Sequence, residues 1–262
     1  MSKSYLYYPG CTLKTKAKEL DTYAIKSLTA LGIDIKELDE WQCCGAVYPQ
    51  TTDEIATRLS CVRALEEAKR AGCDLLTLCS ACHHVMKRVN NDVATNADVR
   101  MKVNNYSEFE APYEGETRVV HFLEMLRDDF GFEQLKKRVV NPLNGYDVGA
   151  YYGCLLLRPG DVMEFDDPEN PSIMEDFLRA IGADPVIYSY RNECCGGYLA
   201  LEDKELVNGL CKNVLSSCVQ KGAHSLITAC PLCRYNLIKN QSDVSLDIYY
   251  FTELLAQALD VK

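Results

Sequence analysis

Short apolar runs alternate along the first half of the chain with longer stretches of helical periodicity. Each run has the length of a β-strand, and Gly32 and Gly72 stand where the first two amphipathic stretches end, as expected for helix C-termini. The expected strands are Tyr5–Tyr8, Ile33–Leu38, Leu75–Leu78 and Arg118–His121, and the expected helices are Lys18–Leu31, Asp53–Ala71 and Phe122–Phe130.

The second half repeats this order of elements. Even the tails correspond, because Phe122–Leu126 aligns with Phe251–Leu255. Strands that alternate with helices predict an α/β fold of two similar repeated domains, each a small parallel sheet with flanking helices. The expected strands are Gly149–Tyr152, Pro185–Tyr190, Ser225–Thr228 and Leu246–Tyr250, and the expected helices are Ile173–Ile181, Lys204–Lys221 and Phe251–Leu259.

One unusual cysteine arrangement also occurs twice. A single cysteine is followed by an adjacent Cys-Cys-Gly and then by a Cys-x-x-Cys, with 34 residues between the last two motifs in both copies, 45–78 and 196–229. Each motif follows an expected strand, and the carboxyl ends of parallel strands share one sheet edge. We therefore expect each set to converge there. The first set is Cys11, Cys43, Cys44, Cys79 and Cys82, and the second is Cys154, Cys194, Cys195, Cys230 and Cys233.

Two stretches of the chain lack the periodicity of a strand or a helix. Lys136–Gly145 is polar and holds Pro142, so we place the boundary there, between domains 1–140 and 146–262. Arg158–Pro171 follows Cys154 and contains Phe165–Pro171, where two prolines forbid a helix. It is either a plain surface loop or a wall of an active site.

Composition narrows the class of protein. The 28 Lys+Arg against 38 Asp+Glu give a net charge of −10, which disfavours nucleic acid and anionic membrane surfaces as partners. The start of the chain lacks the apolar core of a signal peptide, and no stretch approaches the roughly 18 apolar residues of a membrane span. We expect a cytoplasmic protein, in which clustered cysteines bind metal rather than form structural disulfides.

The thiolates could hold iron–sulfur clusters or zinc. Structural zinc usually takes its four ligands from two Cys-x-x-Cys pairs, and each set has only one such pair. Adjacent cysteines project in opposite directions in an extended chain, so Cys43-Cys44 and Cys194-Cys195 suit a turn around a larger, multi-iron object. Iron–sulfur is the favoured interpretation, and a zinc-bound scaffold stays open.

The pattern resembles the duplicated cysteine-rich CCG domain found in the B subunit of heterodisulfide reductase. The resemblance covers nearly the whole chain, and Tyr152-Gly-Cys154, Phe165–Pro171 and His121–Leu126 support it. It implies that each five-cysteine set binds a noncubane 4Fe–4S cluster with one iron open to a substrate sulfur. It thus implies two clusters, one on Cys11, Cys43, Cys44, Cys79 and Cys82, the other on Cys154, Cys194, Cys195, Cys230 and Cys233.

The resemblance also implies a reaction, the two-electron reduction of the disulfide of coenzyme M and coenzyme B or a related small disulfide. The sequence contains no Gly-x-Gly-x-x-Gly nucleotide motif. Electrons would therefore come from an iron–sulfur partner of the C type, fed by a flavin-containing partner of the A type. The alternative is an electron-transfer protein that serves a quinone or another sulfur substrate, because this fold does not fix the substrate.

Other polar residues are candidates for proton transfer or substrate binding. His121 ends an expected strand, where it could transfer a proton or pack at the domain interface; Tyr250 is its counterpart. His83 and His84 could hydrogen-bond cluster sulfur, whereas His224 is expected on a turn. The cations that could meet an anionic substrate are Lys14, Lys16, Arg158, Arg191 and Arg234.

Four cysteines lie outside the two sets. Cys61 and Cys211 fall in expected helices, where a thiol is usually a small buried hydrophobe. Cys73 aligns with His224 rather than with a cysteine, and Cys218 has no matching motif. We therefore expect no third metal site.

Overall fold

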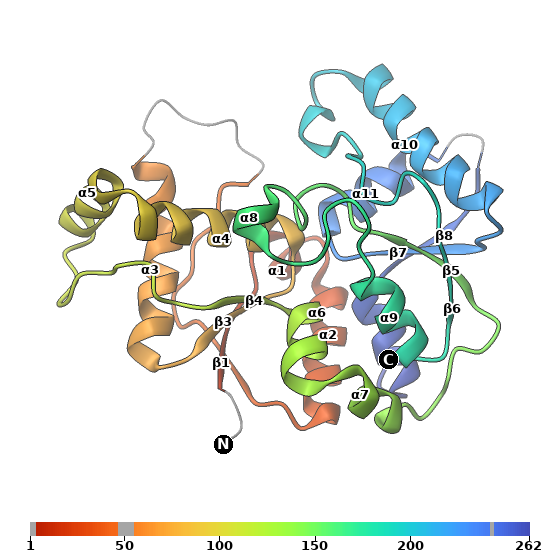
Figure 1. Ribbon diagram of the computed structural model, residues 1–262, viewed down its shortest axis with the longest axis horizontal. Coiled ribbons are helices and arrows are strands. Elements are labelled where there is room, and N and C mark those ends of the chain that lie inside the picture. Colours follow the sequence, from red (N-terminus) through yellow and green to blue (C-terminus); the bar gives the residue numbers. More distant parts are fainter. Residues whose placement is uncertain (1–3, 47–54, 242–243) are drawn as a thin grey trace.

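The structure, a computed structural model, describes residues 4–46, 55–241 and 244–262. Two parallel four-stranded sheets run in the orders β2-β1-β3-β4 and β6-β5-β7-β8, one in each half of the chain (Figure 1). This confirms the predicted α/β fold with a repeated sheet. The strands are β1 Tyr5–Tyr8, β2 Ile35–Glu37, β3 Asp74–Thr77, β4 Val119–His121, β5 Asp147–Tyr151, β6 Asp184–Val186, β7 Ser225–Thr228 and β8 Asp247–Tyr250.

The expected helices of the first half are present in the expected order. The structure adds α1, α4, α5 and α7. α2 has the predicted bounds and ends at Gly32, whose positive φ of 73° suits glycine. The predicted helix from Asp53 begins at Ala56, and its first two residues lie outside the described residues. The helices are α1 Cys11–Lys14, α2 Lys18–Leu31, α3 Ala56–Ala71, α4 Ser80–Thr95, α5 Ala97–Ser107, α6 Phe122–Glu124, the π-helix η1 Met125–Phe130, and α7 Phe132–Arg138.

α7 shortens the expected interdomain linker, because Lys136 to Arg138 form its last turn. The segment from Val139 to Tyr146 then leads into β5. The helices of the second half are α8 Gly160–Met163, α9 Ile173–Ala180, the 3-10 helix η2 Gly197–Leu199, α10 Lys204–Gln220, α11 Pro231–Lys239 and α12 Phe251–Ala258.

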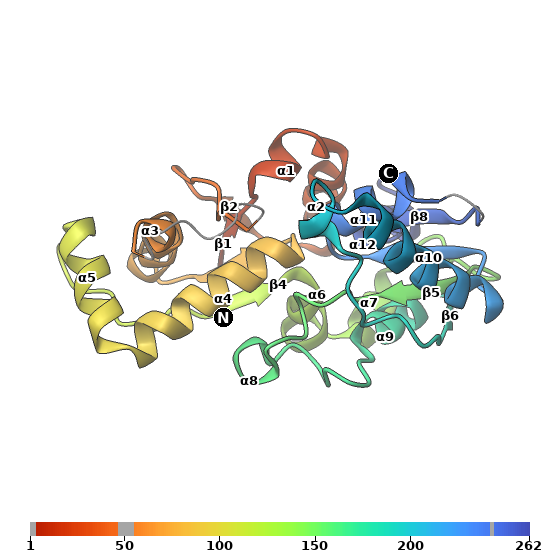
Figure 2. The ribbon, with the colours of Figure 1, turned by 90° about the horizontal axis from the view of Figure 1, so that it is seen from above.

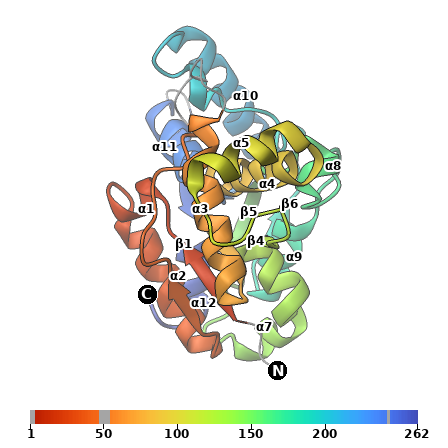
Figure 3. The same cartoon turned by 90° about the vertical axis from the view of Figure 1, so that its left-hand side faces the viewer.

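The two halves exchange their last helices. α12, which follows β8, packs on α2 of the first half, while α6 and α7, which follow β4, pack on α9 of the second (Figure 3). The Thr252 hydroxyl donates to the Leu20 carbonyl oxygen at 3.1 Å, and the Phe251 ring lies 5.7 Å from that of Phe122 and 6.1 Å from that of Phe177. One hydrophobic core therefore runs through both halves. The division into domains 1–140 and 146–262 stays a prediction, because the sheets share this core.

Candidate functional site

The two sets of cysteines lie at the carboxyl ends of the strands. Cys11 follows β1 and begins α1, and Cys79 follows β3 and caps α4, in whose first turn Cys82 lies. Cys154 and Cys230 follow β5 and β7 in the same way. Because these strands run parallel, their ends bring residues distant in sequence to one sheet edge, as expected.

Within each set the thiols lie in close pairs. Cys11 and Cys43 have their sulfurs 3.5 Å apart, as do Cys44 and Cys82. In the second set the sulfurs of Cys195 and Cys233, the counterparts of Cys44 and Cys82, are 3.6 Å apart. The repeat in sequence is thus a repeat in geometry.

Glycines beside the cysteines allow this close approach. Gly10 has a positive φ of 74°, and a Cβ there would lie 2.7 Å from the Cys82 sulfur, so a side chain would displace that thiol. The glycine after each adjacent pair donates its N–H to the first thiol of that pair, Gly45 to Cys43 at 3.5 Å and Gly196 to Cys194 at 3.3 Å. The backbone therefore holds these sulfurs in place.

The two sets meet where the halves touch. The interaction of the Cys230 thiol with Cys79 lowers the pKa of Cys79. Beside them the Ser80 hydroxyl and backbone N–H donate to the Ala229 carbonyl oxygen at 2.7 and 3.1 Å. The Tyr250 phenol donates to the carbonyl oxygens of Leu78 and Ala229 at 2.5 and 3.0 Å. Leu78 directly precedes Cys79, and Ala229 directly precedes Cys230. These hydrogen bonds therefore join the two Cys-x-x-Cys motifs.

Thiol–thiol hydrogen bonds favour thiolates at defined positions. The hydrogen bond from Cys43 lowers the pKa of Cys44 to about 3, and that from Cys154 lowers the pKa of Cys194 to about 6. The hydrogen bond from Cys230 likewise lowers the pKa of Cys79. Because thiolates are the metal-binding form of cysteine, both sets are suited to bind metal.

The arrangement of thiols fits a multi-iron group better than a single ion. In the described parts of the chain, no three Cys, His, Asp or Glu side chains converge closely enough to hold one metal ion. The sulfurs instead contact one another two at a time, Cys11 with Cys43 and Cys44 with Cys82 in the first set. An iron–sulfur cluster distributes its thiolate ligands over several irons, which agrees with this pairwise arrangement.

His121 is fully buried. Its Nε2–H donates to the Leu78 carbonyl oxygen at 3.0 Å, and its Nδ1 accepts from the Leu123 N–H at 3.2 Å. Burial lowers the pKa of His121 to about 3. Both ring nitrogens are engaged in a neutral imidazole, which favours the packing interpretation over proton transfer.

The other histidines differ in their surroundings. His83 is buried and its Nδ1 lies 2.9 Å from the Thr77 hydroxyl, while His84 contacts the Leu155 carbonyl oxygen at 2.9 Å. His224 lies on an exposed turn 3.2 Å from Asp147. In the described structure, none of these contacts is to a cysteine sulfur.

Four of the five candidate cations already have partners in the protein. Lys14 pairs with Asp21 at 2.8 Å and Glu37 at 2.7 Å, whereas Lys16 is exposed. The other partners are Glu169 for Arg158 at 3.2 Å, Glu175 for Arg191 at 3.4 Å, and Glu253 for Arg234 at 3.3 Å. These side chains stabilise the fold around the cysteines.

The stretch Arg158–Pro171 packs between the halves. Phe165 is 1% exposed and its ring lies 5.7 Å from that of His121. Asn192, next to the Cys194-Cys195 pair, donates to the Pro168 carbonyl oxygen at 3.0 Å. Met163, Phe165 and Pro171 are its buried residues, and the rest are exposed or half-buried, so the stretch is a surface loop anchored by buried side chains.

Two cysteines outside the sets support the adjacent pairs. The buried Cys61 thiol contacts the Cys44 carbonyl oxygen at 3.9 Å, and its counterpart Cys211 donates to that of Cys195 at 3.4 Å. The buried Asn236 amide also donates to the Cys195 carbonyl oxygen, at 2.6 Å. Sequence reasoning missed this role, although Cys61 and Cys211 follow the adjacent pairs at similar separations, 17 and 16 residues after Cys44 and Cys195.

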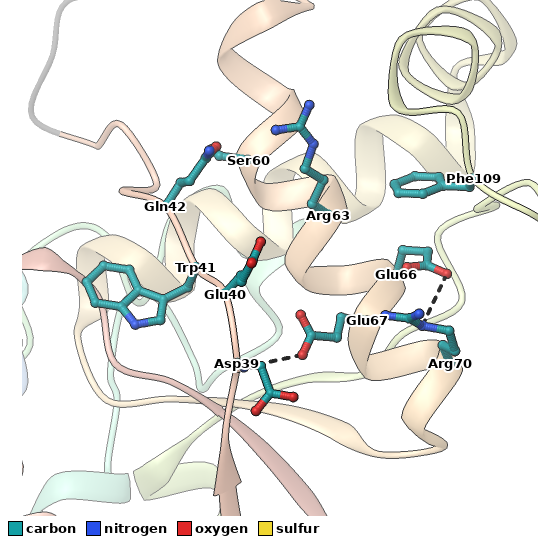
Figure 4. A pocket seen from close by; sticks show the side chains of 10 residues that line it. All are labelled: Asp39, Glu40, Trp41, Gln42, Ser60, Arg63, Glu66, Glu67, Arg70 and Phe109. Atoms are coloured by element: carbon teal, nitrogen blue, oxygen red, sulfur yellow. Dashed lines mark hydrogen bonds and ion pairs between the residues drawn. The ribbon is translucent and has the colours of Figure 1, made fainter.

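A groove of about 570 Å³ opens beside the first set (Figure 4). It lies between α3 and the segment from Asp39 to Gln42, which leads to Cys43. Trp41, Arg63 and Phe109 line it together with several carboxylates. Its Ser60 hydroxyl donates to the Cys43 carbonyl oxygen at 3.2 Å, which joins the groove wall to the set.

Comparisons with known proteins agree with the repeat. The model of the cysteine-rich CCG domain matches residues 5–87 and 148–238. The chain is 30% identical to the "8-methylmenaquinol:fumarate reductase membrane anchor subunit" of Wolinella succinogenes, over 93% of this chain and 84% of that protein. It is 28% identical to an Archaeoglobus profundus protein described as similar to the B subunit of heterodisulfide reductase, over 89% and 80% of the two chains.

Two further matches extend the comparison. The B subunit of the ferredoxin:CoB-CoM heterodisulfide reductase of Methanosarcina mazei is 26% identical over 99% of this chain and 90% of its own. A hypothetical protein from Helicobacter pylori has a similar crystal structure, with a TM-score of 0.75 at 14% identity, over 99% of this chain and 49% of that chain. The latter shows a shared fold alone. Within the described residues, no helix is both long and apolar enough to cross a bilayer.

Proposed function

Because the chain belongs to the family with the cysteine-rich CCG domain, in duplicate, we propose that it is the redox-active B subunit of a heterodisulfide reductase-type complex. In this proposal each five-cysteine set holds one noncubane 4Fe–4S cluster. The ligands would be Cys11, Cys43, Cys44, Cys79 and Cys82 for one cluster and Cys154, Cys194, Cys195, Cys230 and Cys233 for the other.

The observation that carries the proposal is the pair of hydrogen bonds that joins the two Cys-x-x-Cys motifs across the halves, from Ser80 to the Ala229 carbonyl oxygen and from Tyr250 to the Leu78 carbonyl oxygen. Two redox groups held by these sets would lie side by side at one junction. Bound clusters supply electrons one at a time, whereas cleavage of a disulfide needs two. A substrate at the junction could therefore receive one electron from each of the two redox groups.

The proposed reaction is R–S–S–R′ + 2 e⁻ + 2 H⁺ → RSH + R′SH. One S–S bond breaks, each sulfur gains one electron and one proton, and no other bond forms. The electrons come from an iron–sulfur partner of the C type, itself supplied by a flavin-containing partner of the A type, in the cytoplasm. The protons come from solvent at the exposed side of Cys43 and Cys194, while buried His121 positions the Leu78 carbonyl through its hydrogen bond.

Similarity to the B subunits of coenzyme B–coenzyme M heterodisulfide reductases supports a disulfide substrate. The 30% identity to one component of a menaquinol:fumarate reductase favours a second candidate, electron exchange with a quinone. Both need the same two redox groups. They differ in the ligand that binds at the junction, which is a disulfide for the first candidate and a quinone for the second.

The test uses protein purified without oxygen, with reduced methyl viologen as electron donor. The disulfide of coenzyme M and coenzyme B and 2-hydroxyethyl disulfide are offered in turn, and thiols are counted. We expect two thiols per disulfide with at least one of them, and none with Cys195→Ser. Reduction of 2,3-dimethyl-1,4-naphthoquinone without thiol release would favour the second candidate, and turnover of neither would contradict both.

A further inference from the structure

Each sheet has an inner strand that ends in a fully buried tyrosine. β1 ends at Tyr8 and β5 ends at Tyr151, and Figure 2 shows these two strands in separate halves of the molecule. The two positions match in the repeat, because each tyrosine lies three residues before the single cysteine of its set, Cys11 or Cys154. The repeat therefore places one buried phenol in front of each set.

Both phenols bind the backbone that leads into an adjacent cysteine pair. The Tyr8 hydroxyl donates at 2.6 Å to the carbonyl oxygen of Gln42, the last residue before the first pair. The Tyr151 hydroxyl donates at 2.8 Å to the carbonyl oxygen of Glu193, the last residue before the second pair. A buried phenol needs a hydrogen-bond partner, and in both halves it finds one at the same place.

This hydrogen bond orients the exposed cysteine of the pair. The carbonyl of Gln42 and the N–H of Cys43 belong to one planar trans peptide unit, so they point in opposite directions. Tyr8 therefore directs the Cys43 N–H away from the buried phenol, and Tyr151 does the same for the N–H of Cys194. Both cysteines are exposed, so each phenol fixes the solvent side of its set from within the core.

The rings also lie beside the Cys-x-x-Cys motifs. A Cβ on Gly10 would lie 3.5 Å from the Tyr8 ring and 2.7 Å from the Cys82 sulfur. In the second half a Cβ on the corresponding glycine would lie 3.6 Å from both the Tyr151 ring and the Cys233 sulfur. One glycine turn thus separates each ring from a sulfur of its own set.

We propose that Tyr8 and Tyr151 are positioning residues, one for each metal group, which hold Cys43 and Cys194 in place by fixing the peptide in front of each. This inference rests on the proposed function, which supplies the clusters. The phenols act through the cysteines, in the way that hydrogen bonds around a metal site orient its ligands. Removal of one hydroxyl should therefore loosen one set and leave the other unchanged.

The test measures how fast each set releases its metal to a chelator in the absence of oxygen. Tyr8→Phe keeps the ring and its edge contact with Trp41, whose centroid lies 5.9 Å away, and removes the hydrogen bond alone. We expect the metal of one set to leave roughly ten-fold faster than in wild type and that of the other set to keep its rate. Tyr151→Phe should accelerate the other set, and the double variant should accelerate both.

The redox equilibrium of the iron-loaded protein gives a second readout, because hydrogen bonding around a cluster tunes its reduction potential. In an EPR-monitored titration, Tyr8→Phe should shift the reduction equilibrium of one cluster roughly five-fold, the effect of one hydrogen bond. The other cluster should titrate as in wild type. A general loss of stability would not select one cluster in this way.

Tyr7→Phe is the matched control. Tyr7 is the neighbour of Tyr8 in β1 and is also buried, but its hydroxyl donates to Asp21 of α2 at 2.6 Å. It should lose a hydrogen bond and keep the wild-type release rates of both sets. Equal release from Tyr7→Phe and Tyr8→Phe, whether slow or fast, would overturn the inference and leave the proposed function standing. Release of zinc instead of iron would overturn the proposed function, while the rates of the two sets would still decide the role of the phenols.

Discussion

The Tyr250 phenol donates a hydrogen bond at 2.5 Å to the carbonyl oxygen of Leu78, a residue 172 positions earlier in the chain. It also donates to Ala229 at 3.0 Å within its own half. His121, its counterpart in the repeat, donates to the same Leu78 oxygen at 3.0 Å. The ends of β4 and β8 thus both fix the backbone in front of Cys79.

Removal of this phenol should loosen the junction. In Tyr250→Phe the buried carbonyls of Leu78 and Ala229 lose a donor, so we expect the free energy of unfolding to fall by about 1–3 kcal/mol. Denaturant unfolding of the cluster-loaded protein without oxygen measures this. Tyr235→Phe, on the surface, should stay within about 0.5 kcal/mol of wild type. Equal free energies of unfolding for both variants would show that the Tyr250 hydrogen bonds contribute nothing to stability.

The two sets should lose their metal independently. Cys195→Ser removes a thiolate paired with Cys233 at 3.6 Å, so we expect the iron and acid-labile sulfide of the second set to be lost while the first keeps its own. The iron content per chain should fall by about half, and turnover should stop. Cys73→Ser, outside both sets, is the control. Full disulfide-reducing activity in Cys195→Ser would rule out the need for two clusters.

Glu124 should make stability depend on pH. Burial raises its pKa to about 7, so the folded state binds this proton more strongly than the unfolded state does. Stability is then fully present below the ordinary pKa near 4.5 and falls by about 3 kcal/mol as pH rises through 7. Glu124→Gln should flatten this slope between pH 5 and 8, measured by denaturant unfolding.

The matched control for that slope is Glu133→Gln, because Glu133 is an exposed carboxylate in the neighbouring helix α7. It should keep the wild-type pH dependence. The same slope in all three proteins would mean that Glu124 does not titrate in this range.

The buried pair of Arg191 and Glu175 predicts a non-additive effect. Their side chains are 7% and 1% exposed and lie 3.4 Å apart. Arg191→Met leaves a buried carboxylate without its cation, so we expect a loss of about 3–5 kcal/mol. Adding Glu175→Gln should restore part of that stability. A double variant less stable than Arg191→Met would show that the pair is not coupled in this way.

Local patterns in the sequence predicted much of the fold. Strand-length apolar runs, and a glycine after α2, marked elements that the structure contains within a few residues. The convergence of cysteines at the sheet edge followed from parallel strands alone. The long helices α4 and α5 were missed. Only α5 has weak helical periodicity, whereas α4 is as amphipathic as the predicted helices α2 and α3.

Contacts between distant segments could not be predicted in the same way. Nothing near His121 in sequence shows that both ring nitrogens find backbone partners. Nor does the sequence near Arg191 show that Glu175 lies beside it. Both depend on how segments within one half pack against each other, which local periodicity does not specify.

The exchange of last helices has a mechanical consequence. Since α12 packs on α2 and α6 packs on α9, any hinge motion that parts the two sheets must break two packed helix pairs at once. The packing of these helices therefore holds the two halves in a fixed relative position. We expect the spacing of the two sets of cysteines to stay constant during turnover, so that a ligand must fit a gap of fixed width.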